Sequence, residues 1–394
     1  MSTLTRTSLS RTTRALRTGI DTDPAHGAVI PPLHLSSNSA FEGLGRPRRY
    51  DYTRSGNPTR DLLAEALTTL EGGAGAAVTC TGMAAVTLVA TGFARPGQRV
   101  VIPHDAYGGT WRLFDELHRR GVLEVVAVDQ SDAAALAEAL APGAALVWVE
   151  TPSNPLLRVT DVRAVADAAH RAGALVAADN TFCTPLWQQP LELGADLVVH
   201  STTKYLNGHS DVVGGAVVAG TDELAEQLAY WSNVLGITGA PFDSYLTLRG
   251  LRTLPTRLRA HAEGTAAVLD ALVGHPAVAA VHHPGLPDHP GHAVAARQQQ
   301  GFGAMVSLEL AGGREAVARF LDGLQCFTLA ESLGGTESLV AHPPTMTHAS
   351  MTPEAREVAG IGEGLLRLSV GLEDPADLAA DVAAGLERAG GGCR

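Results

Sequence analysis

Lys204 is the only lysine in this chain of 394 residues, because every other member of its 29 Lys and Arg residues is an arginine. A guanidinium group stays protonated at biological pH, whereas a lysine amine with a lowered pKa attacks a carbonyl carbon and forms an imine. A composition that uses arginine wherever a cation suffices, yet keeps one lysine, indicates imine chemistry at Lys204. The alternative is that one lysine is present by chance. The other motifs of the sequence distinguish these two interpretations.

Two residues far from Lys204 in the chain would suit an imine formed with pyridoxal 5′-phosphate (PLP). Such a site needs an acid that keeps the pyridine nitrogen protonated, and Asp179 in ALVAADNT is the candidate. It also needs an aromatic face against the ring, for which Tyr107 in DAYGG is the candidate. Alone, an Asp after a strand is usually a turn residue, and a lone Tyr is usually a packing residue. Their occurrence together with Lys204 favours the PLP site.

A cradle for the phosphate of PLP is predicted where the TGM turn leads into a helix. Gly82 and Met83 stand at the start of this helix, where free backbone N–H groups favour an anion. The hydroxyl groups of Ser201 and Thr203, in HSTTK, would add hydrogen bonds. The glycine-rich EGGAGA segment lacks the spacing of a dinucleotide-binding fingerprint. PLP is therefore the cofactor that the sequence predicts.

The elements that must position these residues alternate between short aliphatic runs and alanine-rich helical stretches. Predicted strands are Ala76–Thr79, Arg99–Pro103, Val122–Val128, Ala145–Glu150, Leu175–Ala178, Leu197–His200 and Gly215–Val218. Predicted helices are Met83–Phe93, Trp111–Arg119, Ala133–Leu140 and Asp161–Arg171, the last with Thr160 as its N-cap. This alternation predicts a largely parallel sheet, whose strands end at one edge where ligands bind.

The fold class expected is α/β, with a large PLP-binding domain and a smaller one. The large domain, residues 61–250, would hold a mostly parallel, doubly wound sheet, and residues 1–60 would form an N-terminal arm. A helical stretch at Phe242–Leu272 leads into a smaller C-terminal α/β domain, residues 251–394. Its predicted elements include the strand Ala304–Leu310 and the helices Arg314–Leu321 and Pro375–Arg388.

Composition argues against several classes of partner. A formal charge of −12 disfavours nucleic acid, and the apolar runs are too short to cross a membrane. The four cysteines are scattered without a CxxC pair, which favours a reduced, cytoplasmic protein over a disulfide or zinc framework. The arginine-rich N-terminus is interpreted as part of the arm. The histidine-rich loop HHPGLPDHPGH is predicted to be a surface turn, and no metal is expected.

Long motifs in order resemble the Cys/Met-metabolism family of fold-type I PLP enzymes, and within it most closely the bacterial enzymes that make cystathionine. The resemblance runs from about residue 14 to residue 388. It rests on YTRSGNPTRD, GGAGAAVTCTGMAA, PHDAYGGTWRLFD, ETPSNPLLR, DNTF, HSTTKYLNGHSDVVGG, FDSYLTLRGLRTL, AARQQQGFGAM, AESLGGTESL, MTHASM and LLRLSVGLED.

The resemblance implies a role for each matching residue. It makes Lys204 the imine-forming lysine and proton shuttle, and Tyr107 a stacking residue that helps proton transfer. The cofactor would be bound by Asp179, Gly82, Met83, Ser201 and Thr203, and by Tyr52 and Arg54 from the neighbouring subunit. A homotetramer built as a dimer of dimers is therefore implied. The substrate α-carboxylate would be bound by Arg367, Asn154 and Ser332.

The activity implied is γ-replacement of an O-acylhomoserine, O-succinylhomoserine foremost, by cysteine to give cystathionine in methionine biosynthesis. Arg112 and Arg48 match positions that resemble the set of residues that binds the distal carboxylate of a succinyl group. Asp51 and Glu331 would contact the amino group of the incoming cysteine or the distal end of cystathionine. Ser55 departs from the enzymes that make cystathionine, which carry arginine there, and matches those that cleave it. Three alternatives stay open: γ-elimination of cystathionine, sulfhydrylation of an O-acylhomoserine, and a catalytically silent PLP-fold protein.

Overall fold

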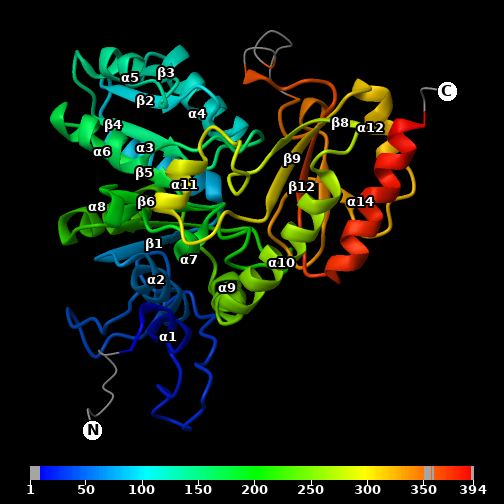
Figure 1. The fold of residues 1–394 in the computed structure, drawn as a ribbon. Helices are drawn as coiled ribbons and strands as arrows, with labels where there is room; N and C mark the ends of the chain where they lie inside the picture. Colours follow the sequence, from blue (N-terminus) through cyan, green and yellow to red (C-terminus); the bar gives the residue numbers. More distant parts are fainter. Residues whose placement is uncertain (1–8, 350–355, 357–358, 392–394) are drawn as a thin grey trace, which may run out of the picture.

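The chain forms two β-sheets with helices packed around them, drawn in Figure 1 from a computed structural model. The structure describes residues 9–349, 356 and 359–391. Along the chain, the larger sheet comes first and the smaller sheet follows a pair of helices. The predicted α/β fold class is confirmed.

The larger sheet has the strand order β1-β7-β6-β5-β4-β2-β3 within the described residues. Its strands are β1 (Gly75–Thr79), β2 (Arg99–Pro103), β3 (Glu124–Val128), β4 (Leu146–Glu150), β5 (Leu175–Asp179), β6 (Leu197–His200) and β7 (Gly215–Ala219). Neighbouring strands are parallel except where β7 pairs with β1 and β6. The described segment 201–214 forms turns and no crossover helix, and a parallel return requires such a crossover, so β7 returns antiparallel.

Helices cover both faces of this sheet, which explains why its strands are nearly continuous apolar runs. One face packs against α3, α4 and α8, and the other against α2, α5, α6 and α7. The bounds of the helices up to this point are α1 (Arg11–Leu16), α2 (Pro58–Glu71), α3 (Gly82–Phe93), α4 (Gly108–Arg119), α5 (Ala133–Leu140), α6 (Val162–Arg171), α7 (Thr184–Trp187) and α8 (Asp222–Leu235).

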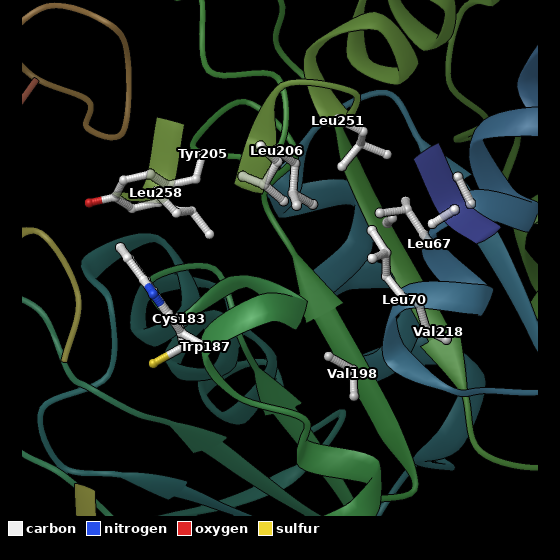
Figure 2. Close-up of a cluster of buried hydrophobic side chains, with 14 of the residues drawn as sticks. Leu67, Leu70, Cys183, Trp187, Val198, Tyr205, Leu206, Val218, Leu251 and Leu258 are labelled. Carbon is white, nitrogen blue, oxygen red and sulfur yellow. The ribbon is translucent and has the colours of Figure 1, made fainter. Parts of the chain in front are cut away.

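A buried apolar cluster under the sheet fixes the chain on both sides of the lysine loop (Figure 2). Val198 on β6 precedes the loop, and Tyr205 and Leu206 directly follow Lys204. Tyr205 is fully buried, with its ring edge-on to Trp187 at a centroid distance of 6.1 Å. Because packing holds both neighbours of the loop, the backbone of Lys204 has a fixed position at the end of β6.

The smaller sheet has the order β10-β11-β12-β9-β8 and lies beside the larger one (Figure 1). Its strands are β8 (Val278–His282), β9 (Met305–Leu310), β10 (Thr328–Leu329), β11 (Leu339–Ala341) and β12 (Leu365–Ser369). The helices of this region are α9 (Pro241–Leu251), α10 (Leu254–Leu272), α11 (His292–Gln298), α12 (Gly313–Leu321) and α14 (Pro375–Gly390). Residues of α10, α12 and α14 share one apolar core with this sheet.

Two predicted helix starts are wrong. The helix predicted from Trp111 begins at Gly108, which makes Tyr107 the N-cap residue of α4. The N-cap of α6 is Asp161, whose carboxylate accepts the Ala164 N–H at 3.1 Å. Thr160, the predicted cap, instead donates its backbone N–H to the Thr151 hydroxyl at 3.0 Å. Aspartate is preferred over threonine as an N-cap residue, which agrees with the helix being capped by Asp161.

Two further boundaries and the histidine-rich loop also differ from the predictions. The stretch predicted as one helix at Phe242–Leu272 is broken between α9 and α10, because Pro255 has no N–H to continue the ladder. The strand predicted from Val122 begins at Glu124. The histidine-rich loop is not wholly a surface turn, since His283 is buried and accepts the Gly285 N–H through Nδ1 at 3.1 Å. Within the described residues, no helix is both long and apolar enough to cross a membrane.

Candidate active site

A cleft of about 710 Å³ lies where β4, β5 and β6 of the larger sheet end, with β12 of the smaller sheet supplying another wall. The sequence predictions named sixteen residues, and the cleft brings together all of them except Arg48, Asp51, Tyr52 and Arg54. The predicted residues that line it are Gly82, Met83, Tyr107, Arg112, Asn154, Asp179, Ser201, Thr203, Lys204, Glu331, Ser332 and Arg367.

Lys204 occupies this cleft, and its Nζ donates a hydrogen bond to the Ser332 hydroxyl at 2.8 Å. Burial, and next the positive charge of Arg367, lower the pKa of Lys204 to about 8, while Glu331 opposes the shift. A lower pKa raises the fraction of neutral amine near neutral pH, and the neutral amine is the form that attacks carbonyls and accepts protons. The surroundings therefore prepare this lysine for imine chemistry.

Arg367 lies on β12 and is 3% exposed. Its Nη1 donates to Asn154 Oδ1 at 3.0 Å, and its Nη2 donates to the Ser332 carbonyl at 2.8 Å. Burial lowers the pKa of Arg367 to about 10, so the guanidinium stays charged at neutral pH. Its buried Nε has no hydrogen-bond partner among the described residues. A substrate carboxylate would satisfy this free donor.

Ser332 is the residue that joins Lys204 and Arg367. Its hydroxyl accepts from the amine and its carbonyl accepts from the guanidinium. Its φ of 81° lies in the left-handed region, which is uncommon for residues other than glycine. Such strain is maintained only where surrounding contacts fix the backbone, and here they fix it between two cations of the cleft.

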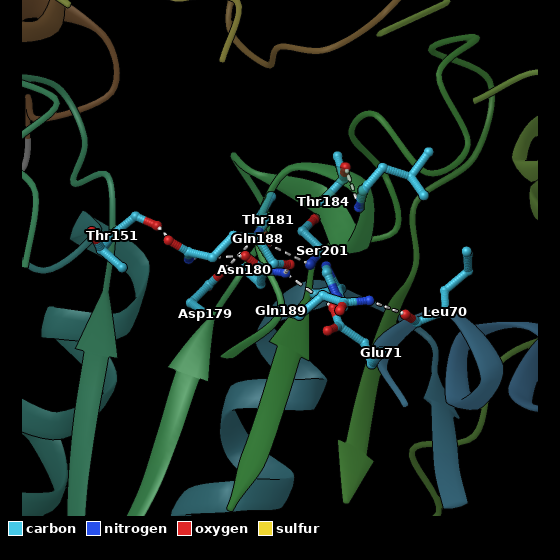
Figure 3. Close-up of polar contacts among 12 residues, drawn as sticks. Leu70, Glu71, Thr151, Asp179, Asn180, Thr181, Thr184, Gln188, Gln189 and Ser201 are labelled. Carbon is cyan, nitrogen blue, oxygen red and sulfur yellow. Dashed lines mark hydrogen bonds and ion pairs between the residues drawn. The ribbon is translucent and has the colours of Figure 1, made fainter. Parts of the chain in front are cut away.

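Asp179 ends β5 and faces the cleft, and Figure 3 shows the polar contacts around it. Its Oδ1 accepts the Thr181 N–H at 2.9 Å, and the Thr181 hydroxyl accepts the Ser201 N–H at 2.9 Å. Burial raises the pKa of Asp179, while Thr181 and His200 lower it. The contacts thus connect the acid to the loop that carries Lys204.

A second polar group packs directly after Asp179 along the chain. The Asn180 amide donates to Glu71 Oε1 at 3.0 Å and to the Gln188 carbonyl at 2.8 Å (Figure 3). His200 Nε2 lies 2.6 Å from the same Glu71 oxygen, and both side chains are fully buried. These bonds tie the ends of β5 and β6 to the end of α2.

The start of α3 forms a concave backbone turn in the cleft. Thr81 is the N-cap, and its hydroxyl accepts the Ala84 N–H at 2.8 Å. A Cβ added at Gly82 would lie 2.8 Å from the Ser201 Cβ, so only glycine allows Ser201 to approach the start of this helix so closely. The Thr203 hydroxyl donates to the Gly214 carbonyl at 3.1 Å and accepts its N–H at 3.0 Å, so its hydrogen is already engaged.

Tyr107 is 43% exposed at the mouth of the cleft. Its backbone N–H donates to Glu150 Oε2 at 2.6 Å. A Cβ at Gly109 would lie 2.6 Å from Tyr107 Cε1 and 2.8 Å from Met83 Sδ, so the glycine makes room for the ring. Burial, and next Glu331, raise the pKa of the Tyr107 phenol, which therefore stays protonated at neutral pH.

These residues fit PLP. The chain supplies an amine with a lowered pKa, a buried carboxyl group, an aromatic ring and a helix N-terminus that lines the cleft. Among the residues that the structure describes, no group of three or more His, Cys, Asp or Glu side chains is arranged to hold a metal ion.

The four predicted residues outside the cleft lie on the N-terminal arm. Arg54 donates to the Asn233 carbonyl and side chain of its own chain, at 2.9 and 2.7 Å. Tyr52 is 50% exposed, and Arg48 and Asp51 are exposed as well. None of the four lines the cleft of its own chain.

Five polar residues of the cleft were not predicted from the sequence: Thr81, Thr110, Glu150, Thr181 and Thr347. Glu150 ends β4 and Thr181 follows β5, and both line the cleft. The signal was available for Glu150, since it ends a predicted strand in the same way as Asp179. Only Asn154 was singled out from that ETPSNP motif.

Comparisons with known proteins agree with this geometry. The profile of the family described as "Cys/Met metabolism PLP-dependent enzyme" matches residues 12–387. The chain is 54% identical to cystathionine gamma-synthase of Escherichia coli (strain K12) over 380 residues, covering 96% of this chain and 98% of the relative.

Two solved structures are similar over almost the whole chain. Both are of cystathionine gamma synthase from Xanthomonas oryzae pv. oryzae, with a TM-score of 0.96 and coverage of 97% of this chain and 98% of theirs. One, at 60% sequence identity, is a complex with aminoacrylate and cysteine, and the other, at 61%, is a complex with cystathionine.

Proposed function

The chain belongs to the Cys/Met metabolism family of PLP-dependent enzymes, and we propose that it makes cystathionine by γ-replacement on an O-acylhomoserine with cysteine as the thiol. The observation that carries the proposal is that Ser332 accepts hydrogen bonds from both Lys204 Nζ and the Arg367 guanidinium. A base and a carboxylate-binding cation are therefore held next to each other in one cleft by their contacts with the same residue. The similarity to the two γ-synthases favours synthesis of cystathionine over its cleavage.

The residues that would hold PLP are Lys204, Asp179 and Tyr107, together with the backbone at Gly82 and Met83. Ser201 lies beside this cradle. When bound, PLP supplies an electron-withdrawing ring that acidifies the C–H bond next to the substrate nitrogen.

Lys204 would then move the protons of the reaction. Its amine, with a pKa of about 8, would take a proton from Cα of the homoserine ester and later one from Cβ, which allows the Cγ–O bond to break and the acyloxy group to leave as a carboxylate. The cysteine thiolate adds at Cγ, and the same amine returns the protons. A lysine side chain is flexible enough to serve these carbon atoms in turn. Arg367 and Asn154 would hold the α-carboxylate while these steps occur.

The acyl donor we propose is O-succinylhomoserine. Arg112 lines the cleft and is exposed, which leaves its guanidinium free for the distal carboxylate of a succinyl group. Glu331 lines the same cleft and would meet an amino group of cysteine. Arg48 and Asp51, on the arm, would contribute from a neighbouring subunit. A turnover assay tests the function by comparing O-succinylhomoserine with cysteine, O-acetylhomoserine with cysteine, and cystathionine alone. Faster turnover of cystathionine than of either ester would favour the γ-lyase reaction instead.

In the same assay, Arg112→Ala should lower kcat/KM selectively for O-succinylhomoserine. An exposed ion pair contributes up to about 1 kcal/mol, and a desolvated charge-assisted hydrogen bond about 1.5–3 kcal/mol. Since about 1.4 kcal/mol corresponds to tenfold, the loss should be roughly fivefold to a hundredfold. O-acetylhomoserine and cystathionine should be affected little, because neither carries the succinyl carboxylate. Equal losses for all three substrates would make Arg112 a structural cation and remove the succinyl assignment.

We also propose that the active enzyme is a homotetramer built from dimers in which the arm of one subunit completes the cleft of the next. The support is that Tyr52 and Arg54 are exposed and lie outside the cleft of their own chain. The exposed apolar side chains Leu35, Phe41 and Leu44 on the same arm would be covered by such a contact.

Mixing two inactive variants tests this assembly. Arg54→Ala should weaken retention of PLP, and Lys204→Ala should prevent imine formation. A mixed dimer would contain one cleft with both residues intact, so activity should recover to roughly a quarter of the wild-type level if subunits pair at random. Each variant assembled alone is the control. Absence of recovery in a mixed dimer verified by mass would show that each cleft is complete within one chain.

We place this activity in the cytoplasm. Cys80, Cys183 and Cys326 are free thiols among the described residues, which suits a reducing compartment.

A further inference from the structure

Two carboxyl groups end neighbouring strands at the back of the cleft. Glu150 is the last residue of β4 and Asp179 the last of β5, and the two are direct partners in the sheet register. Partner residues on adjacent strands point to the same side of a sheet. Both side chains accordingly line the same cleft.

Glu150 is 6% exposed and is held by two N–H donors. The Tyr107 backbone donates to Oε2 at 2.6 Å, and the Trp148 indole donates to Oε1 at 2.9 Å. Trp148 is itself fully buried. The carboxyl group of Glu150 therefore fixes the backbone at the start of α4, and with it the position of Tyr107, the N-cap residue of that helix.

The charged neighbour that acts most strongly on Glu150 is another acid. Burial first, and then Asp179, raise the pKa of Glu150 to about 8, against the opposing effect of its donors. Two adjacent buried carboxylates resist ionising together, so one of them retains a proton. Both carboxyl groups accept hydrogen bonds, Asp179 from Thr181 and Glu150 from Tyr107 and Trp148. Among the described residues, only Asp179 also has an imidazole nearby, that of His200, which lowers its pKa.

We propose that Glu150 and Asp179 form a carboxyl dyad that holds one proton, carried by Glu150, so that Asp179 alone presents a negative charge to a cationic ring in the cleft. Glu150 is a positioning residue in this arrangement, since it acts through Tyr107 and Asp179. The inference rests on the proposed PLP chemistry of this cleft and adds a residue to it.

The proton on Glu150 gives a pH dependence with a definite sign. A carboxyl group whose pKa is raised from 4.5 to about 8 by folding binds more protons in the folded state between those values. Its contribution to the free energy of unfolding is therefore complete below the lower value and is lost as pH rises through about 8.

The other titratable groups near the dyad act in different ranges of pH. The pKa of Lys204 is lowered from 10.5 to about 8, so between these values this residue makes the free energy of unfolding increase with pH, which is the opposite sign. The Tyr107 phenol has a raised pKa and stays neutral throughout. The slope between pH 5 and pH 8 therefore separates the dyad from these two groups. The comparison with Glu150→Gln removes the contribution of the buried histidines His261, His283 and His348, whose pKa values burial lowers to about 4.

The test uses the full-length chain, with and without bound PLP, and two measurements. Infrared spectroscopy detects the C=O stretch of protonated carboxyl groups. Most of the 41 Asp and Glu residues lose their proton, and with it this band, well below pH 7. In the chain without PLP, this band should persist at pH 7 and disappear near pH 8, and it should be absent in Glu150→Gln. The decrease of Tm with pH between pH 5 and pH 8 should also flatten in Glu150→Gln.

Two further variants keep the proposal testable if Glu150→Gln does not fold. Asp179→Asn removes the neighbouring charge, so the carboxyl band should disappear at a lower pH. Trp148→Phe removes one donor to the carboxylate, so the band should persist to a higher pH. A chain without the band at pH 6, or a midpoint that Asp179→Asn leaves unchanged, would overturn the dyad. Either result would leave the proposed activity standing, since both measurements follow protons and neither follows turnover.

Discussion

Lys204→Arg should abolish both the visible absorption of bound PLP and its covalent attachment after reduction with borohydride. The substitution keeps a positive charge in the cleft, but a guanidinium does not form the imine. Turnover should fall by many orders of magnitude, because the same amine moves the protons at Cα and Cβ. Mass spectrometry of the reduced protein measures the attachment directly.

The composition provides a control for this experiment. Lys204 is the only lysine, so a label that remains in Lys204→Arg has only the N-terminal amine to occupy. Peptide mapping would distinguish that amine from the loop. A label found on the loop of Lys204→Arg would show that the site has been misplaced.

Arg367→Ala should produce the second largest loss. The substitution removes the proposed carboxylate-binding fork and leaves Asn154 Oδ1 and the Ser332 carbonyl without their buried donor. Truncating one member of a buried charged pair costs about 2–5 kcal/mol. This predicts a decrease in kcat/KM of roughly thirtyfold to several thousandfold, equally for both homoserine esters.

The variant Arg367→Lys separates the contribution of the positive charge at this position from that of the guanidinium geometry. A lysine keeps the charge but lacks the two parallel donors of the fork, so it should recover part of the loss and no more. The absorption of bound PLP should remain in both variants, because Arg367 is not among the residues proposed to hold it. Full activity in Arg367→Lys would mean that charge alone binds the carboxylate, and an unchanged kcat/KM in Arg367→Ala would remove Arg367 from the site.

The part of the site on the large sheet could be predicted because parallel strands share an edge. Asp179 and the Lys204 loop each follow an aliphatic run, so a strand pattern was enough to bring them together. The same rule applied to Glu150, but a carboxyl group shows its function only when its neighbours are known. Its contacts with Tyr107 and Asp179 come from the start of another helix and from sheet register.

Other features depended on tertiary structure that no local pattern reports. The reversal of β7 depends on a loop between strands, not on the residues of the strand itself. The engagement of the Thr203 hydroxyl by Gly214 depends on how that loop folds back. The arm residues were recognised through motif resemblance, and among the described residues of one chain they do not line the cleft of Lys204.

Because the chain has a single lysine, proteolysis at that residue can measure how often the region around Lys204 opens. A protease that cuts only after lysine has one bond to cleave, between Lys204 and Tyr205. Tyr205 is fully buried, and the loop is anchored on both sides, so the protease reaches this bond only when the region opens. Where opening and closing are fast, the cleavage rate follows the free energy of that opening. Cleavage of the chain without PLP would measure that opening directly, because an imine with PLP would remove the charged amine that such a protease recognises.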